Sequence, residues 1–460
     1  MNYPDDTIAA ISTPVGQGGI GIVRLSGPGA IDIADRIFRS KKNEKPSDAP
    51  SHKMLYGHII DPADERVVDE VLLAIMRAPN TYTREDVVEI NCHGSMISVR
   101  QILEIVLRQG VRVADPGEFT KRAFLHGRID LSQAEAVLDI IHAKTEESMR
   151  IASEQLRGGL TEKLAEIREQ LIEIAAFVEA HIDFPEDEIE TTSKVEIEKK
   201  LLETGAEIRR LSDTFNEGRF FREGLSIAIV GRPNVGKSSL LNALLQKDRA
   251  IVTDLPGTTR DLIEDYLNIS GLPIRIMDTA GIRSSDETIE QEGIRRSIQA
   301  LSHADFIVAL FDGSEPFAQE DHDLLGIVRD KKALIVINKS DLPQKISLEH
   351  SAAEGKQSVC VSAVTGEGIE RLKSVIFESN LHGWKEEREG VVVTNIRHKA
   401  ALDRAAESLG RARSLLSENN PLELFSIEMR SSLDSVGEIT GTITTDEILQ
   451  KIFDSFCIGK

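Results

Sequence analysis

The chain has 460 residues, with 76 acidic and 55 basic side chains and a formal net charge of −21 at pH 7. At roughly 150 residues per domain, this length predicts about three domains, each large enough for its own core. A surface with this excess of negative charge repels nucleic acid and anionic lipid overall. Any RNA contact therefore requires a local basic patch or a partner protein. With 15 Phe, 4 Tyr and 1 Trp, the composition also disfavours an extended base-stacking platform.

Targeting signals and disulfides are not expected. No apolar run approaches the ~18 residues of a membrane span, and residues 1–15 lack the basic and apolar regions of a secretory signal. We therefore predict a soluble, cytoplasmic protein. The three cysteines, Cys92, Cys360 and Cys457, are odd in number and lack metal-ligand spacing, which argues against a disulfide framework or a zinc site. Cys92 and Cys360 stand in strand-like segments and are predicted to be small buried hydrophobes.

The first part of the chain, 6–120, has a mixed α/β pattern. Strands are predicted in TIAAIS, GIGIVRLSG and VVEINCH, and a helix around 96–109. Residues 16–21 match G-x-G-x-x-G as text. They lead into a strand, whereas a dinucleotide-binding loop leads into a helix, so we interpret them as a strand–turn–strand.

From 131 the pattern becomes helical. Between 131 and 182 there is no proline, and apolar residues recur every three or four positions on one helix face: Leu160, Leu164, Ile167, Leu171, Ile174, Val178 and Ile182. Pro185 ends this pattern within the acidic run 183–190, which is typical of a solvated connection rather than of a metal site. A second helical pattern covers about 193–216.

A different pattern follows Gly218 and ends near 380. Short β-branched strands (LSIAIV, PIRIM, DFIVALF, ALIVI, SVCVS) alternate with helical lengths, which is typical of a doubly wound parallel sheet. After Arg397 the chain is helical again, through about 400–409, 422–436 and 448–456. The economical interpretation is an α/β unit inserted into a helical domain, and the alternative is four domains in a row.

Residues 231–238, GRPNVGKS, form a G-x-x-x-x-G-K-S loop between the strand LSIAIV and the helix SSLLNALL. This context is the one that phosphate binding requires, because the glycines let backbone N–H groups surround the phosphates at a helix N-terminus. Lys237 is expected to reach the β- and γ-phosphates, and the Ser238 hydroxyl to bind magnesium.

Three further motifs follow in the expected order. Asp278 opens DTAG and is expected to hold magnesium through water, while the Gly281 N–H senses the γ-phosphate. In NKSD, 338–341, the Asp341 carboxylate can accept two hydrogen bonds from guanine, whereas adenine leaves it unpaired. Ser362 and Ala363 follow the strand SVCVS and support the base edge. Together these motifs select GTP over ATP.

The segment 253–261 is the first switch, with Thr259 predicted to complete the magnesium shell. Ile282 stands where signalling GTPases carry a water-orienting glutamine, so the water-positioning group must come from elsewhere; candidates in the loop are Arg283, Asp286, Glu287, Glu290 and Glu292. The predicted GTP site comprises Asn234, Val235, Gly236, Lys237, Ser238, Ser239, Thr253, Asp254, Leu255, Pro256, Gly257, Thr258, Thr259, Asp278, Thr279, Ala280, Gly281, Asn338, Lys339, Asp341, Ser362 and Ala363.

The last residues, FCIGK at 456–460, should fray unless other residues hold them. On sequence alone, an inert tail and a functional one are equally good interpretations. Basic residues at Arg24 and at 121–128 could hold an anionic ligand, although by themselves they are ordinary surface charges.

The whole pattern resembles the MnmE (TrmE) family of tRNA-modification GTPases. The resemblance rests on GRPNVGKS, GTTRD, DTAGIR and NKSD, on PGEFTKRAFLHGRIDLSQAEA at 116–136 and on the final FCIGK. It covers essentially the full length and implies an N-terminal tetrahydrofolate-binding α/β domain (1–120), a discontinuous helical domain (121–217 and 381–460) and an inserted Ras-like G domain (218–380).

The resemblance also implies an activity and partners. Family members are homodimers through the N-terminal domain and act with an FAD-dependent partner, MnmG (GidA), which carries the FAD. Together they add an aminomethyl-type (carboxymethylaminomethyl) group at carbon 5 of the tRNA wobble uridine. A reduced folate, 5-formyl- or methylene-tetrahydrofolate, supplies the carbon, and GTP hydrolysis gates the reaction.

Site residues follow from the same resemblance. Glu290 matches the family's water-orienting catalytic glutamate. Potassium is expected at Asn234, Thr253, Leu255 and Thr258, where a monovalent cation can replace an arginine finger. Magnesium falls to Ser238 and Thr259, and the folate contacts are Arg24, Glu89, Arg128 and Lys460, with Cys457 near the pterin. The family more often has lysine at the position of Arg128.

Two other functions fit parts of the sequence. A ribosome- or RNA-binding GTPase switch suits Asn234 and Ile282, although no basic RNA module is visible. The other alternative function is a folate-dependent transferase with a regulatory G domain. Measurements of potassium dependence, folate binding and tRNA nucleoside composition distinguish these two functions from the tRNA-modification GTPase.

Overall fold

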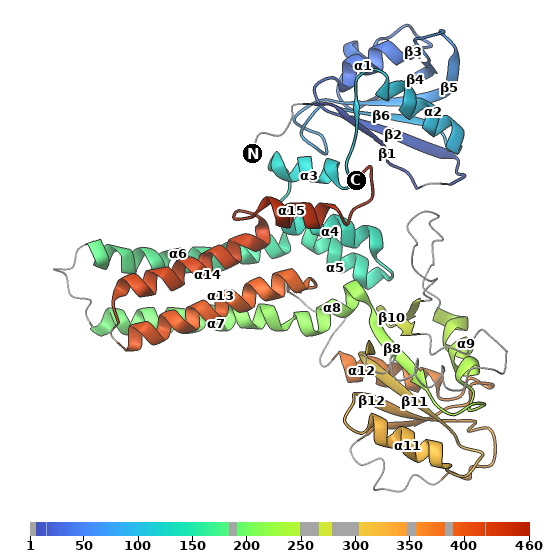
Figure 1. The fold of residues 1–460 in the computed structure, drawn as a ribbon, viewed down its shortest axis with the longest axis vertical. Coiled ribbons are helices and arrows are strands. Elements are labelled where there is room, and N and C mark those ends of the chain that lie inside the picture. Colours follow the sequence, from blue (N-terminus) through green and yellow to red (C-terminus); the bar gives the residue numbers. More distant parts are fainter. Residues whose placement is uncertain are drawn as a thin grey trace. The chain divides into compact units, whose positions relative to one another are not determined.

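The computed structural model describes residues 6–14, 16–183, 191–248, 266–277, 303–346, 356–381, 390–418 and 420–460. These residues group into two compact units. The first comprises the residues up to Leu138 together with Leu433–Lys460, and the second the described residues between Asp139 and Ser432. This division does not delimit the three predicted domains, whose boundaries stay a prediction. Figure 1 shows two separate sheets and a set of long helices, so the predicted combination of α/β and all-α parts is confirmed.

The first unit contains a seven-stranded sheet of order β3-β4-β5-β6-β2-β1-β7. Its pairs are antiparallel except β1 with β7. Helices α1 (Ala30–Ile37) and α2 (Met96–Leu107) contribute apolar residues to its core. The strands are β1 (Ile8–Ile11), β2 (Ile20–Ser26), β3 (Phe38–Ser40), β4 (Lys53–Ile60), β5 (Val67–Met76), β6 (Val87–His93) and β7 (Arg112–Val113).

The antiparallel pair β1·β2 confirms the strand–turn–strand interpretation of 16–21. Strands β3, β4 and β5 were not predicted from the sequence. Their hydrophobic pattern is interrupted by exposed positions, and pairing with neighbouring strands fixes them.

A small helical core completes the first unit. Helix α3 (Glu118–Leu125), the start of α4 (Leu131–His142) and α15 (Asp446–Phe453) enclose a cluster of apolar side chains. Phe453 and Phe456 belong to this cluster and are 1% and 5% exposed. Residues more than 300 positions apart thus share one hydrophobic core, which attaches the last part of the chain to the first.

The second unit contains most of the long helices. Its helices are α5 (Glu146–Leu156), α6 (Gly159–Asp183), α7 (Thr191–Asp213), α8 (Phe215–Glu223), α13 (Ile396–Ser417) and the first part of α14 (Leu422–Thr440). Six of the seven apolar residues predicted on one face of α6 are buried, and Ile182 is partly exposed. The α6 prediction is therefore confirmed, except at the helix end.

The second sheet has the order β13-β12-β11-β8-β10-β9. All pairs are parallel except β9 with β10, which confirms the predicted mostly parallel sheet. The strands are β8 (Leu225–Val230), β9 (Tyr266–Ile269), β10 (Leu272–Met277), β11 (Phe306–Asp312), β12 (Ala333–Asn338) and β13 (Ser358–Cys360), and the described helices are α9 (Lys237–Asp248), α11 (Gln319–Val328) and α12 (Ile369–Asn380).

Cysteine burial agrees with the prediction at one position only. Cys92 in β6 is 3% exposed, and burial raises its pKa to about 11. Cys360 is exposed, so its predicted burial was wrong. It lies on the short edge strand β13, whose middle residue Val359 alone faces the core.

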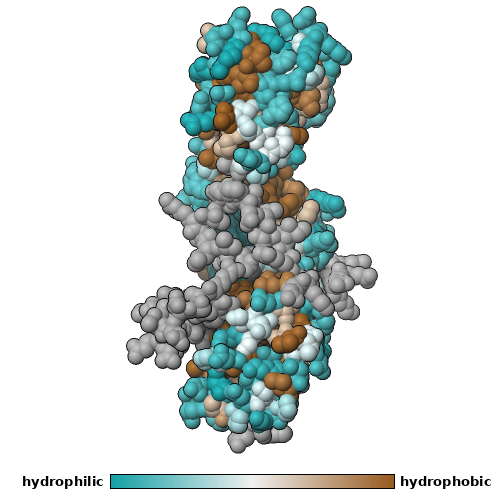
Figure 2. Space-filling view, turned by 90° about the vertical axis from the view of Figure 1, so that its right-hand side faces the viewer, coloured by the Kyte–Doolittle hydropathy of each residue, from teal (hydrophilic) through white to brown (hydrophobic). Residues whose placement is uncertain are grey.

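None of the described helices is long and apolar enough to cross a membrane. The surface drawn in Figure 2 is largely hydrophilic, with smaller groups of hydrophobic residues, in keeping with the net charge of −21.

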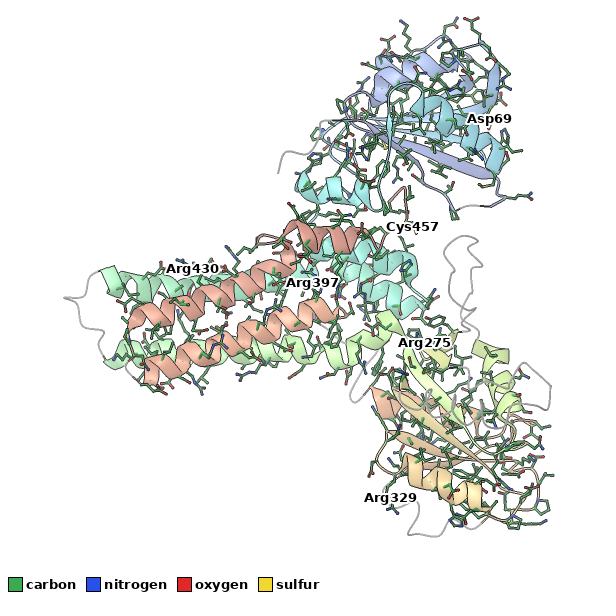
Figure 3. The ribbon with its side chains drawn as sticks, viewed as in Figure 1. Asp69, Arg275, Arg329, Arg397, Arg430 and Cys457 are labelled. Carbon is green, nitrogen blue, oxygen red and sulfur yellow. The ribbon has the colours of Figure 1, made fainter. Side chains whose placement is uncertain are left out.

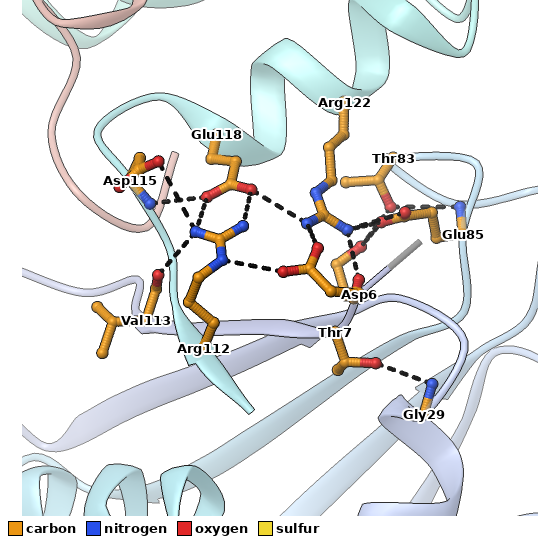
Figure 4. A network of polar contacts seen from close by, with 11 residues as sticks. Asp6, Thr7, Gly29, Thr83, Glu85, Arg112, Val113, Asp115, Glu118 and Arg122 are labelled. Atoms are coloured by element: carbon orange, nitrogen blue, oxygen red, sulfur yellow. Dashed lines mark hydrogen bonds and ion pairs between the residues drawn. The ribbon is translucent and has the colours of Figure 1, made fainter. Parts of the chain in front are cut away.

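A buried network of charges fixes α3 against the first sheet (Figure 4). Arg122 donates to Asp6 at 2.6 Å, to Glu85 at 3.0 Å and to Glu118 at 3.0 Å. Arg112 donates to Glu118 at 2.6 Å. Burial by itself raises the pKa of Glu118, but the hydrogen bonds from Arg112, Asp115 N–H and Arg122 outweigh it, so this pKa lies below its usual value of 4.5.

Removing Arg122 should leave buried carboxylates without a cation. We expect Arg122→Met to lower the free energy of unfolding of the first unit by about 3 kcal/mol. Because the pKa of Glu118 is depressed, this stabilisation is complete above pH 4.5 and is lost as the pH falls through the lower folded pKa. Urea unfolding at pH 7 and pH 4 measures both effects.

The control is Arg100→Met, which removes an exposed pair with Glu104 on α2. It should change the free energy of unfolding by less than about 1 kcal/mol. Equal effects of Arg122→Met and Arg100→Met would contradict the importance of the buried network.

Candidate functional site

The predicted phosphate loop, 231–236, lies at the carboxyl end of the buried central strand β8 and leads directly into α9. Strand β8 is flanked by the parallel strands β11 and β10, so this loop stands at one edge of the sheet. The first N–H groups of a helix have no partner within the helix and attract anions. The position of the loop therefore fits a phosphate.

The backbone of the loop requires its particular residues. Asn234 and Gly236 have φ values of 65° and 97°, a left-handed conformation that asparagine and glycine adopt more readily than other residues. A Cβ atom on Gly236 would lie 2.3 Å from Asn338 Nδ2, and one on Gly231 would lie 2.4 Å from the Leu310 carbonyl oxygen. Both glycines are thus needed for close packing, and they keep the loop compact.

Lys237 folds back over the loop. Its Nζ donates to the carbonyl oxygens of Gly231 and Arg232, each at 2.8 Å. Burial lowers the pKa of Lys237. Val235 is buried, whereas Asn234, Ser238 and Ser239 are exposed and accessible to a ligand. A half-buried ammonium group beside a helix N-terminus is the donor set that a phosphate requires.

The base-recognition motif is joined to this loop by one buried amide. Asn338, at the end of β12, is 2% exposed. Its Nδ2 donates to the Val235 carbonyl oxygen at 2.8 Å, and its Oδ1 accepts from the Ala363 N–H at 3.1 Å. The segments containing 235, 338 and 363 are therefore in contact, as the predicted GTP site requires.

The neighbours of Asn338 have different environments. Lys339 has a φ of 64° and its Nζ lies 2.5 Å from Asp312 Oδ2 at the end of β11. Asp341 is exposed, so its carboxylate is available to a base. Ser362 is fully buried and its Oγ accepts from the Thr365 N–H at 3.1 Å, which shapes the turn beside Ala363. Asp312, which the sequence analysis did not identify, has no motif of its own and is brought here by the parallel pairing of β11 and β12.

Many of the predicted site residues lie outside the described residues. These are Thr253, Asp254, Leu255, Pro256, Gly257, Thr258, Thr259, Asp278, Thr279, Ala280, Gly281 and Glu290, together with the other loop candidates Arg283, Asp286, Glu287 and Glu292. Of the expected potassium ligands only Asn234 is described, and of the magnesium ligands only Ser238. Within the described part of the chain, no group of three or more His, Cys, Asp or Glu side chains could hold a metal ion.

A second candidate site lies in the first unit, around Arg24. Arg24 on β2 and Glu89 on β6 are directly opposite in the sheet, and Arg24 Nε donates to Glu89 Oε1 at 2.8 Å. The Arg24 guanidinium carbon lies 5.6 Å from the centre of the Phe119 ring. That of Arg128 lies 4.7 Å from the Tyr82 ring. Two of the predicted folate residues, Arg24 and Arg128, thus lie near aromatic rings that were not singled out from the sequence, and Glu89 is paired with Arg24.

Residues 456–460 are held at this site. Gly459 accepts hydrogen bonds from Ser12 Oγ at 3.2 Å and Arg24 Nη1 at 3.4 Å. The Phe119 N–H donates to the Lys460 carbonyl oxygen at 3.1 Å, and Ile458 forms an isolated bridge with Pro116. Other residues therefore hold the tail, which meets the condition under which it was expected not to fray, whereas its function stays a prediction.

The ends of the tail differ in their surroundings. Burial and the neighbouring Arg24 charge lower the pKa of Lys460. Cys457, on the segment that follows α15 (Figure 3), has an exposed side chain. A cation at Lys460 beside Arg24 favours an anionic ligand, since two like charges are stabilised by a shared negative partner.

Comparisons with known proteins agree with this architecture. Residues 131–457 match the model of the MnmE helical domain, and residues 7–128 match that of the GTP-binding protein TrmE N-terminus. The chain belongs to the MnmE (TrmE) family. The family prediction, and with it the predicted enzyme class of tRNA-modification GTPase, is therefore confirmed.

Full-length relatives share this assignment. A protein of Alkaliphilus oremlandii (strain OhILAs) named tRNA modification GTPase MnmE is 48% identical over 460 residues, which is 100% of each chain. One of the same name from Geobacter metallireducens (strain ATCC 53774 / DSM 7210 / GS-15) is 48% identical over 459 residues, 100% of each chain. Among solved structures, the G domain of the T. maritima FeoB iron transporter is 30% identical, with a TM-score of 0.26; the match covers 34% of this chain and 98% of that domain.

The Asn338 amide provides a test of the nucleotide site. Asn338→Ala should leave the Val235 carbonyl and the Ala363 N–H without their partner, and we expect it to weaken GDP binding at least tenfold. Asn338→Asp retains an acceptor for Ala363 but cannot donate to Val235. It should therefore weaken binding as well. Titration with a fluorescent GDP analogue measures both.

Asn380→Ala is the matched control, since this buried asparagine donates within α12 to the Ile376 carbonyl oxygen. It should leave GDP affinity within about twofold of the wild type. GDP binding unaffected by Asn338→Ala would show that the amide does not organise the site.

Proposed function

We propose that this chain is a potassium-stimulated GTPase that, with an FAD-dependent partner, modifies carbon 5 of the tRNA wobble uridine. The observation that carries the nucleotide assignment is the Asn338 amide, which joins the phosphate loop to the turn at Ala363. The family membership supports the link to tRNA. A cytoplasmic location and a homodimer formed through the N-terminal domain are part of the same proposal.

In the G domain, the residues of the chain bind and orient GTP. Backbone N–H groups of 234–239 and the Lys237 ammonium contact the phosphates, while Asp341 accepts hydrogen bonds from guanine. Ser238, with Thr259, would hold magnesium, and Asn234, Thr253, Leu255 and Thr258 would hold potassium. A potassium ion at this place supplies positive charge next to the phosphates. Glu290 would orient the attacking water.

The first unit is proposed to bind the reduced folate that supplies the carbon. Arg24, Arg128 and Lys460 provide positive charge for the folate carboxylates, and Glu89 accepts hydrogen bonds. Its pairing with Arg24 at 2.8 Å also fixes the direction of that guanidinium. Cys457 is exposed beside this site. FAD would be carried by the partner, MnmG (GidA).

Nucleoside analysis of tRNA from a deletion strain tests the proposed function. Unchanged wobble uridines in that tRNA would instead favour the RNA-binding GTPase switch.

The potassium proposal predicts a large cation effect on GTP hydrolysis. The turnover number in potassium should exceed that in sodium at least tenfold, because a monovalent cation beside the phosphates can replace an arginine finger. Asn234→Gly removes the amide oxygen but tolerates the φ of 65° at this position. It should therefore remove most of the potassium effect while leaving GDP binding within a few fold. Equal turnover in the two cations, or full stimulation in Asn234→Gly, would exclude this mechanism.

The folate proposal predicts that 5-formyltetrahydrofolate binds the chain and that Arg24→Ala weakens this binding at least tenfold. Lys460→Ala should weaken it less, since the Lys460 ammonium is only half-buried. Isothermal titration calorimetry measures each affinity. Arg100→Ala, an exposed arginine on α2, is the control and should bind folate as the wild type does. Wild-type affinity in Arg24→Ala would require another folate site.

A further inference from the structure

Arg232, the arginine of the phosphate loop, contacts a carboxylate about 90 residues further along the chain. Arg232 Nε lies 3.1 Å from Asp321 Oδ2, and Arg232 Nη2 donates to Glu315 Oε2 at 3.2 Å. The Asp321 side chain is 1% exposed, Arg232 17% and Glu315 60%. The pair with Asp321 is therefore shielded from water, whereas the pair with Glu315 is open to it.

Asp321 is held in place before it meets Arg232. It lies in the first turn of α11, where its Oδ2 accepts from the Ala318 N–H at 3.0 Å. Among the described residues, neither Arg232 Nε nor Asp321 Oδ1 has a hydrogen-bond partner. The contact between the two side chains is thus an ion pair without a hydrogen bond, and each side chain also has one hydrogen-bonded partner, Glu315 for Arg232 and the Ala318 N–H for Asp321. Removing the Arg232 guanidinium would leave the buried Asp321 carboxylate without the cation that lies 3.1 Å from it.

Arg232 connects this ion pair to the residues that face the phosphates. Its own carbonyl oxygen accepts from Lys237 Nζ at 2.8 Å. Two residues later, Asn234 has its left-handed φ of 65°. Asparagine adopts this conformation more readily than most residues, and contacts that fix the neighbouring backbone stabilise it. An Arg232 side chain held by α11 therefore fixes the backbone that orients both Lys237 and Asn234.

We propose that Asp321 is a positioning residue for the nucleotide site and that it acts through Arg232. This inference rests on the proposed GTPase function, and neither the phosphate-loop motif nor the base-recognition motif contains Asp321. The exposed Glu315 contributes little by comparison, because exposed ion pairs are weak. The end of β11 also contacts the nucleotide site, since Asp312, the last residue of this strand, pairs with Lys339 of the base-recognition motif.

The test is the rate at which a fluorescent GDP analogue leaves the magnesium-containing full-length protein. Asp321→Asn, which keeps an oxygen for the Ala318 N–H, should release it roughly tenfold faster. Arg232→Met should accelerate release of the GDP analogue to a similar extent. If Asp321 acts through Arg232, the double variant should release GDP no faster than Arg232→Met alone, whereas independent structural damage would multiply the two effects.

Asp323→Asn is the matched control. Asp323 lies on α11 two residues after Asp321, is exposed and accepts a hydrogen bond from Gln319 of the same helix. The Asp323→Asn variant should therefore release the GDP analogue within twofold of the wild-type rate. Wild-type release in Asp321→Asn, or multiplied effects in the double variant, would overturn the proposal. If Asp321→Asn does not fold, Arg232→Met is compared with the charge-retaining Arg232→Lys, and equal rates in these two would overturn it as well.

The proposed function fails in a different way. Equal hydrolysis in potassium and sodium would remove the potassium proposal without changing these release rates. Absence of GDP binding by the wild type would overturn the GTPase assignment, and this inference with it.

Discussion

The attachment of residues 446–460 to the first unit is the constraint on which the architecture depends. Closing a loop of more than 400 residues has an entropic cost that no single contact offsets. Several contacts act together here: Phe453 and Phe456 enter the small helical core, and Gly459 accepts hydrogen bonds from Ser12 and Arg24. Gly459 itself has a φ of 95°, and a Cβ at this position would lie 2.2 Å from the Ile11 carbonyl oxygen.

This attachment also builds a chemical site. The same segment that closes the chain brings Lys460 to Arg24, on a strand whose partner carries Glu89. Because Arg24 and Lys460 are far apart in the sequence, their positive charges come together only when the tail is docked. Loss of the docking contacts would therefore affect both the stability of the first unit and its capacity to bind an anion.

The nucleotide site follows a different principle, in which one loop is fixed from several sides. Asn338 contacts its middle, Lys237 folds back over its beginning, and Arg232 reaches α11. Each of these contacts orients backbone groups, so the loop is arranged before a phosphate arrives. Preorganisation of this kind lowers the cost of binding, since little conformational freedom is lost when the ligand enters.

The sequence by itself determined the family, the parallel sheet with its phosphate loop, and the buried face of α6, because each depends on local spacing or on a continuous motif. It did not predict strands β3 to β5 or the exposure of Cys360, which depend on the position of a strand within its sheet. Only the tertiary structure decided the partners of side chains distant in sequence, such as Arg24 with Gly459, Asn338 with Val235 and Arg232 with Asp321. The physical reason is that hydrophobic periodicity specifies which face of an element is buried, whereas the neighbour against which it packs is chosen by the whole fold.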